Sequence, residues 1–274
     1  MPAISQAIAI PTLAPRFHLA GGEAFLRFDH CLTILRAARE AGYLEISATT
    51  NGYWGRLPEV AAARCRELYD AGLTTLEISW DHWHRPYIDN EAVSNCLEAS
   101  REAGIPVILR LLTTRTHDVE EALSTLRPDA LDAAAMIFST TVANTGRAAV
   151  EVDPDEIFAR GDLSENCHSA LSLTINPAGD VFPCCSGLDQ THALCFGNIR
   201  RSDIRAIVDA MDRSALLRRI VFEGIASLVP LIEEAGVELH GRHSSICSLC
   251  WTIFSRPDCV AALKAQFPCD QFAK

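Results

Sequence analysis

Three segments of the chain end in closely similar tetrapeptides. The sequences REAG, YDAG and REAG finish at Gly42, Gly72 and Gly104, which are 30 and 32 residues apart. A glycine at the end of a helical pattern is typical of a helix C-terminus, because glycine adopts the left-handed conformation without steric cost. Short apolar runs flank each of these helices. The region therefore predicts alternating strands and helices, which form right-handed strand–helix–strand units and a parallel sheet.

The expected elements fill residues 17–139. The expected strands are 17–20, 44–49, 74–80, 105–112 and 134–139, and the expected helices are 29–41, 58–71, a segment from 89 that ends before 104, and 119–126. Continuous apolar runs in the strands favour a sheet with helices on both faces. The periodicity leaves open whether this sheet is open or curled into part of a barrel.

Polar residues and glycines gather where these strands end. In parallel α/β folds, ligands bind at that edge of the sheet, so this clustering predicts a ligand site. Taken singly each position is weak evidence, since an Asn-Gly pair is usually just a turn. The residues are Gly21, Gly22, Glu23, Asn51, Ser79, Asp81, His82, His84 and Arg110.

Asp81, His82 and His84 allow several interpretations. In a functional one, Asp81 and His84 are catalytic as a proton donor or as substrate contacts. In a structural one, the histidines belong to a loop and form hydrogen bonds with the backbone. A mononuclear metal site on His82 and His84 is disfavoured, because Asp81 is the one nearby candidate for a third ligand.

Four cysteines in the C-terminal part form two pairs. Cys167 is followed by eleven residues, Gly179, four residues and Cys184, whereas Cys247 and Cys250 form C-x-x-C. The second spacing lets two thiolates from one turn reach a single metal centre. Asn-Pro-Ala before Gly179 indicates a turn between two short strands, and such a hairpin brings distant cysteines together. The spacing leaves open Zn²⁺ or an iron–sulfur cluster, and Cys185 in place of Cys184.

Composition limits the class of protein. A net charge of −11 over 274 residues argues against nucleic acid as a partner, because phosphate binding needs clustered Lys and Arg. No apolar run reaches the roughly 18 residues of a membrane span, and the N-terminus lacks the pattern of a signal peptide. We therefore expect a cytoplasmic protein without a membrane partner.

Cytoplasmic thiols stay reduced, so metal ligation explains a C-x-x-C better than a disulfide does. Cys31, Cys65 and Cys96 lie inside helical patterns and are expected to serve as small core residues. The sequence assigns no role to Cys195, Cys259 and Cys269.

Taken in order, several segments resemble a radical S-adenosylmethionine (SAM) enzyme with a C-terminal auxiliary-cluster domain of the SPASM/Twitch type. LAGGEAFL is similar to the family's GGEP motif, with Ala24 in place of proline. TTNGYW and LEISWDHWH resemble its third and fourth core strands. CHSALSLTINPAGDVFPCC, FGNIR and CSLC resemble the auxiliary domain. The resemblance covers about residues 16–259.

This resemblance implies an α/β fold, a partial (β/α) barrel that lacks its first strand, followed by a small cysteine-rich α+β domain. It divides the chain into four parts. They are 1–16, the remnant of an N-terminal helix; 17–150, the partial barrel; 151–166, a linker; and 167–274, the cluster-binding domain.

The sequence departs from the family at one point. The family holds its catalytic 4Fe–4S cluster on C-x3-C-x2-C, upstream of the GGE strand, whereas the twenty residues before Gly21 contain no cysteine. Two explanations remain: the sequence is a fragment of an enzyme, or it has lost the catalytic cluster and become a binding protein. A third hypothesis is a structural zinc protein that uses the same four thiolates.

The resemblance also implies the chemistry. A reduced 4Fe–4S cluster passes one electron to SAM, and the 5′-deoxyadenosyl radical that results abstracts a hydrogen atom from a peptide or small polar substrate. That catalytic cluster is expected only if the missing N-terminal segment is present. An electron donor such as a flavodoxin or ferredoxin is the expected partner.

The resemblance further assigns residues to these cofactors. By motif position, Gly21, Gly22 and Glu23 would hold the methionine amine of SAM. Asn51, Ser79 and Arg110 are candidates for its ribose and carboxylate. An auxiliary 4Fe–4S cluster would lie on Cys167, Cys184, Cys247 and Cys250. Eight residues separate Cys250 from Cys259, so we expect no second auxiliary cluster.

Overall fold

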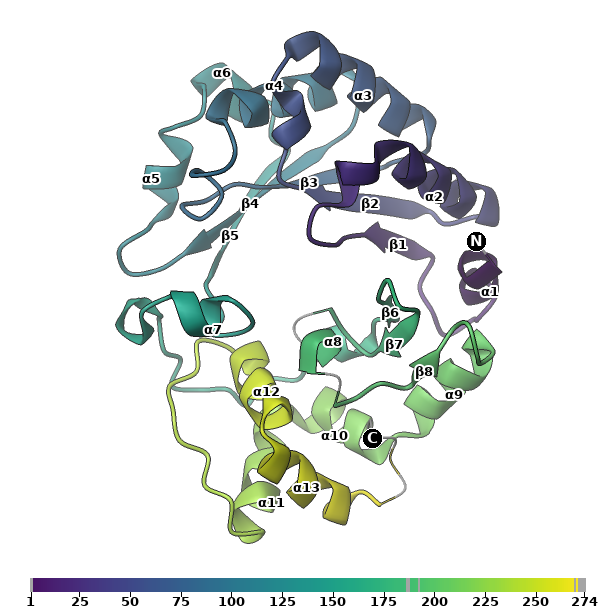
Figure 1. Cartoon of the computed structure of the whole chain (residues 1–274), viewed down its shortest axis with the longest axis vertical. Helices are drawn as coiled ribbons and strands as arrows, with labels where there is room; N and C mark the ends of the chain where they lie inside the picture. Colours follow the sequence, from purple (N-terminus) through teal and green to yellow (C-terminus); the bar gives the residue numbers. More distant parts are fainter. Residues whose placement is uncertain (1, 186–187, 192, 269, 271–274) are drawn as a thin grey trace. The chain divides into compact units, whose positions relative to one another are not determined.

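The computed structural model describes residues 2–185, 188–191, 193–268 and 270. The chain divides into two compact units, Met1–Thr141 and Val142–Lys274 (Figure 1). Each unit has its own hydrophobic core of buried side chains. The two units are therefore described one at a time.

The first unit contains a five-stranded sheet in which every neighbouring pair is parallel and the strands follow chain order. This confirms the predicted parallel α/β sheet, with strand ends shifted by a few residues. The strands are β1 Arg16–Leu19, β2 Glu45–Thr50, β3 Thr75–Ser79, β4 Val107–Thr113 and β5 Met136–Thr141. The helices are α1 Pro2–Ile8, η1 Ala24–Arg27, α2 Phe28–Ala41, η2 Tyr53–Gly55, α3 Pro58–Asp70, α4 Asn90–Glu102, α5 Val119–Leu123 and α6 Pro128–Leu131.

The long helices of this unit end where the repeated tetrapeptides predict. Gly42 and Gly72 both have a positive φ, 96° and 99°, which side chains other than glycine rarely adopt. At Gly72 an added Cβ would also lie 2.6 Å from Cδ of Arg39. Glycine is thus required there by conformation and by space, and the chain turns sharply into β3.

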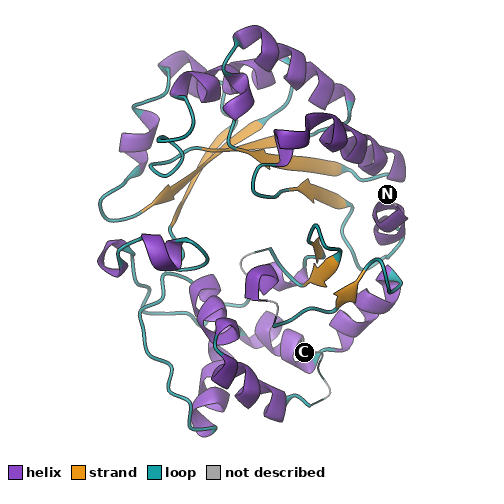
Figure 2. Cartoon of the chain, viewed as in Figure 1, coloured by secondary structure: helices purple, strands orange, loops and turns teal. Residues whose placement is uncertain are grey.

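The sheet of the first unit is amphipathic. Along β2, β3 and β4, buried Ile46, Leu76 and Leu109 alternate with Ser47 and Glu77 on the opposite face. Helices α2–α6 lie on one side of the sheet (Figure 2). Within this unit the expectation of helices on both faces is therefore wrong. The second face of β2 and β3 carries polar side chains, and these strands have the period-two pattern of a half-buried sheet.

The second unit joins a small antiparallel sheet to a set of helices. Its strands are β6 Thr174–Ile175, β7 Asp180–Phe182 and β8 Gly197–Asn198. Its helices are α7 Ala148–Glu151, η3 Pro154–Glu156, η4 His168–Leu171, α8 Leu188–Thr191, α9 Ile204–Arg213, α10 Ala215–Glu223, η5 Ile225–Leu228, α11 Val229–Glu234, α12 Ile246–Ser255 and α13 Pro257–Gln266. The predicted hairpin is confirmed: β6 and β7 pair across a turn in which Gly179 has φ +90°.

Among the described helices, none is both long and apolar enough to cross a membrane on its own. The pair α12 and α13 passes that test by length and composition when taken together, with a bend of 91° between them. Leu249, Ile253 and Leu263 of this pair are buried in the core of the second unit.

Candidate functional site

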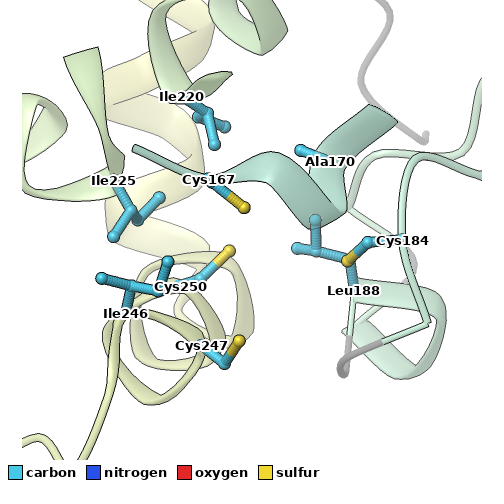
Figure 3. A pocket seen from close by; sticks show the side chains of 9 residues that line it. All are labelled: Cys167, Ala170, Cys184, Leu188, Ile220, Ile225, Ile246, Cys247 and Cys250. Atoms are coloured by element: carbon cyan, nitrogen blue, oxygen red, sulfur yellow. The ribbon is translucent and has the colours of Figure 1, made fainter. Parts of the chain in front are cut away.

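Four cysteine side chains line one cavity of the second unit. Cys167, Cys184, Cys247 and Cys250 face it from three separate segments (Figure 3). The cavity has a volume of about 20 Å³. The other side chains that line it are all apolar: Ala170, Leu188, Ile220, Ile225 and Ile246. The structure thus brings together the four cysteines that the sequence singles out.

Local structure explains how each segment presents its sulfur. Cys184 lies two residues after the end of β7, so the β6–β7 hairpin fixes its position. Cys247 and Cys250 lie on the first and second turns of α12, where residues three apart share one face of a helix. Ser245 caps this helix, and its hydroxyl accepts a hydrogen bond from the backbone N–H of Ser248 at 3.2 Å.

The spacing of the sulfurs bears on which metal centre would fit. A single tetrahedral zinc with Zn–S bonds of 2.3 Å places its sulfurs about 3.8 Å apart. Within the part of the chain that the structure describes, no three of the four sulfurs lie within 4.8 Å of one another. As they lie, the four sulfurs are therefore spread more widely than the corners of a single zinc tetrahedron.

The surroundings also favour a positively charged occupant. Burial raises the pKa of the Cys250 thiol well above its ordinary value, and the neighbouring Cys184, Cys167 and Cys247 thiols raise this pKa further. Several thiolates cannot share an apolar cavity without a compensating cation. Metal ions supply that charge and hold coordinated thiols in the deprotonated form.

The remaining cysteines lie in other settings. Cys185 is exposed, Cys259 is buried in the core of the second unit, and the Cys195 thiol donates to the Gly197 carbonyl at 3.4 Å. Cys269 lies outside the described residues. The core prediction for Cys31, Cys65 and Cys96 is confirmed, because all three are buried in the first unit. Burial raises the pKa of Cys65 to about 11.

In the first unit, Glu23 joins the loop after β1 to the end of β2. Its Oε1 accepts hydrogen bonds from the Thr50 hydroxyl at 2.8 Å and the Phe25 N–H at 3.0 Å. Its Oε2 accepts a hydrogen bond from the Asn51 N–H at 2.7 Å. Three donors therefore fix this carboxylate at the C-terminal edge of the sheet.

Gly21 and Gly22 precede Glu23 and are exposed. Neither has a positive φ, and a Cβ added to either would meet no atom within 4 Å. Backbone strain and internal packing therefore do not require glycine at these two positions. Close approach of a ligand to the backbone is the remaining physical reason for two glycines.

The other residues predicted for this edge are partly buried and lie on β3, β4 or the turn after β2. Asn51 accepts a hydrogen bond from the Tyr53 N–H at 3.0 Å, which forms a tight turn. Ser79 and Arg110 are register partners on β3 and β4. Arg110 pairs with Glu77 at 2.8 Å and lies 5.1 Å from the Phe138 ring.

Sequence analysis misses part of this network. Glu77 Oε2 also accepts a hydrogen bond from the Thr49 hydroxyl at 3.5 Å, and that hydroxyl bonds His18 Nε2 at 3.0 Å. Burial lowers the pKa of His18; Glu77 acts in the opposite direction, and Arg110 adds to the lowering. The alternation of polar residues along β1 to β4 is the signal that identifies this face.

The comparisons with known proteins identify the cysteine-rich part of the chain. Residues 167–251 match the model of SPASM, an iron–sulfur cluster-binding domain. The protein YydG of Bacillus subtilis (strain 168), whose name refers to peptide biosynthesis, is 20% identical over 241 residues, which cover 86% of this chain and 75% of YydG. The chain carries a SPASM domain. Beyond that domain it is similar to radical SAM proteins.

A second relative matches a shorter stretch. GTP 3′,8-cyclase of Aeromonas hydrophila subsp. hydrophila is 44% identical over 66 residues, which cover 24% of this chain and 18% of the cyclase. Because so little of the cyclase is covered, its reaction provides no argument about this protein.

Asp81 and His84 form one structural unit after β3. Asp81 is buried, with 1% exposure. Its Oδ1 accepts hydrogen bonds from the backbone of Trp83 and His84 and bonds His84 Nδ1 at 2.7 Å. Its Oδ2 accepts from the Leu112 N–H at 3.3 Å. Asp81 therefore orders the loop, and proton exchange between His84 and a ligand would go through Nε2.

His82 points elsewhere. Its ring stacks on the ring of His117, with centroids 3.4 Å apart and planes 18° apart. Both histidines face Glu121. His117 and Glu121 are absent from every motif considered above, because neither follows a strand end directly.

Proposed function

We propose that this protein acts in the radical SAM modification of a peptide, with an auxiliary 4Fe–4S cluster in its SPASM domain. The observation that carries this proposal is the similarity to YydG, which spans 86% of the chain and therefore extends well beyond the SPASM match. Peptide biosynthesis is the one activity class that the name of this relative supplies.

For the auxiliary cluster we propose Cys167, Cys184, Cys247 and Cys250 as the ligands. Their shared apolar cavity and the match of residues 167–251 to an iron–sulfur cluster-binding domain support this choice. A cluster in this position would anchor a substrate or relay an electron from a donor such as a flavodoxin or ferredoxin.

For SAM we propose the C-terminal edge of the first unit's sheet, with that sheet as a partial (β/α) barrel that lacks its first strand. Gly21 and Gly22 let the ligand approach the backbone, and the fixed Glu23 carboxylate accepts hydrogen bonds from the methionine amine. Asn51, Ser79 and Arg110 lie at the same edge and would contact the ribose and carboxylate. The Arg110 guanidinium would then pair with the SAM carboxylate as well as with Glu77.

In this family a reduced 4Fe–4S cluster together with SAM supplies the radical that removes a hydrogen atom from the substrate. The 274 residues contain no C-x3-C-x2-C, so this chemistry requires such a motif from outside them. The second candidate function is accordingly an iron–sulfur protein that binds a peptide without catalysis.

If the protein is an enzyme, we propose that His84 carries out a proton transfer to or from the substrate and that Asp81 positions its ring.

The deciding experiment measures turnover. The protein is expressed with any in-frame C-x3-C-x2-C segment encoded upstream of Met1, purified anaerobically, reconstituted with iron and sulfide and reduced with dithionite. It is then incubated with SAM and with peptides encoded beside its gene. The expected result is 5′-deoxyadenosine together with a mass change in one peptide. Bound iron and a bound peptide without 5′-deoxyadenosine would contradict catalysis and support the second candidate. Colourless protein with stoichiometric zinc would contradict both.

A pair of variants tests the SAM edge by calorimetry. Glu23→Ala is expected to abolish SAM binding, because it removes the acceptor for the amine. Thr50→Val removes the hydrogen bond behind that carboxylate, together with the acceptor for the Gly52 N–H and the Trp54 indole N–H, at a residue with 2% exposure. SAM affinity should persist at a cost of about 3 kcal/mol in stability, because buried donors lose their partner. Unchanged SAM affinity in Glu23→Ala would rule out this edge.

A further inference from the structure

Three potential metal ligands meet in the first unit, away from the cysteines. His82 Nδ1 lies 3.6 Å from Glu121 Oε1, and His117 Nδ1 lies 3.0 Å from Glu121 Oε2. The three residues offer one ligand atom each, and these atoms all lie within 4.8 Å of one another. Among the described residues, this is the set of His, Cys, Asp and Glu side chains that meets that distance.

The local fold holds these three side chains in place. His82 belongs to the loop after β3, which Asp81 orders. His117 closes the turn after β4, where its carbonyl accepts a hydrogen bond from the Thr114 N–H at 2.9 Å. Glu121 lies four residues further on, within α5, on the helical face that returns to His117. The trio therefore joins two loops at the C-terminal edge of the sheet.

The chemistry of the trio suits a divalent ion. Two imidazole nitrogens and one carboxylate oxygen are the ligands that zinc takes in sites with three protein ligands. The His82 and His117 rings stack with centroids 3.4 Å apart, and both face the Glu121 carboxylate. Their nitrogens and the carboxylate oxygens therefore converge on one small region.

Neighbouring groups shape the site from two sides. Trp83 packs its ring edge-to-face against His82 and His117, with centroids 5.6 and 5.9 Å away. This leaves the imidazoles little freedom to separate. Arg85 bonds Glu121 Oε1 at 2.7 Å, so its guanidinium competes with an ion for the same carboxylate oxygen.

We propose that His82, His117 and Glu121 form a binding site for a divalent first-row transition-metal ion, with zinc as the reference ion. Three protein ligands leave a coordination position open for water or for a polar group of a substrate. The ion would also cross-link the loops after β3 and β4. The site shares no residue with the four cysteines and none with the residues proposed for SAM.

The test is calorimetric titration with zinc chloride under anaerobic conditions. The full chain carries its reconstituted cluster, so the thiolates are occupied, and constant visible absorbance shows that they remain so. We expect one equivalent of zinc to bind. His82→Ala and Glu121→Gln should each weaken this binding by about tenfold or more, since even the loss of an outer-shell partner costs roughly 10- to 100-fold.

Two further variants separate ligation from general effects. His30→Gln removes an exposed histidine of α2 and should leave zinc affinity unchanged. Arg85→Gln removes the competing guanidinium and should tighten zinc binding. Far-UV circular dichroism verifies that each variant is folded. Absence of zinc binding to the wild-type chain, or equal affinity in wild type, His82→Ala and Glu121→Gln, would overturn the proposal.

Discussion

Cys184 and Cys185 are chemically identical neighbours, yet they occupy opposite environments. Cys184 is buried with 6% exposure and lines the thiol cavity, whereas Cys185 is exposed. Successive side chains of an extended segment point to opposite sides, so only one of two adjacent cysteines faces the cavity. The short strand β7, which ends at Phe182, sets which one it is.

This difference makes a matched test. Cys184→Ala is expected to lower iron content and the visible absorbance of the reconstituted protein, because it removes one of four cavity thiols. Cys185→Ala should retain both. Iron and acid-labile sulfide are measured per chain for wild type and both variants. Equal iron loss in the two variants, or loss only in Cys185→Ala, would refute the assignment of Cys184.

At residue scale, the spacing of the cysteines in the sequence identifies those that line the cavity. Short segments, the C-x-x-C turn and the β6–β7 hairpin, determine where these side chains lie. Spacing fails for His82. Its neighbours in space, His117 and Glu121, are 35 and 39 residues away along the chain, and no local pattern connects them. The sequence also does not predict the structural role of Asp81. Its carboxylate accepts a hydrogen bond from the Leu112 N–H, 31 residues further along the chain.

Helix α12 carries two of the four cavity thiols within its first two turns. The unpaired N–H groups of a helix N-terminus give that end a partial positive charge, which stabilises thiolates close to it. Ser245 is the N-cap of this helix and lies two residues before Cys247. The cap therefore stabilises the helix and also the position of the Cys247 thiol.

We expect Ser245→Ala to cost about 1 kcal/mol in stability, the usual effect of losing an N-cap, and to speed the release of iron to a chelator. The control is Asp203→Ala, which removes the N-cap of α9, where Asp203 accepts a hydrogen bond from the Arg205 N–H at 2.8 Å. A similar stability loss without faster iron release is expected there. Iron release is followed by visible absorbance. Equal release rates in the two variants would contradict the role of the α12 cap.

At element scale, most of the first unit follows from local pattern. Repeated helix ends and apolar runs predict the order and direction of its five strands, because both signals lie within a few residues of each boundary. The face that the helices cover was predicted incorrectly. A single polar residue interrupts each apolar run, at Ser47, Glu77 and Arg110. These three positions fall on one face of the sheet, so the apolar runs do not predict helices on that face.

At the scale of the whole molecule, the two units have separate cores. The hydrophobic cluster of the first unit consists of residues from 4 to 134, and that of the second consists of residues from 163 to 267. The four cavity thiols all belong to the second unit and come from positions far apart along its chain. A cluster bound there links three segments of one core.

Removal of the cluster should therefore loosen the second unit selectively. The binding free energy of a structural metal centre contributes directly to folding, and its loss leaves four thiols around an apolar cavity. Hydrogen exchange measured by mass spectrometry, before and after anaerobic chelation of iron, is expected to quicken in peptides from η4, α10 and α12. Peptides from β2, β3 and β4 should keep their protection, because their core contains none of these thiols. Unchanged exchange around α12, or equal acceleration in β3, would show that these thiols do not stabilise the second core through a shared metal centre.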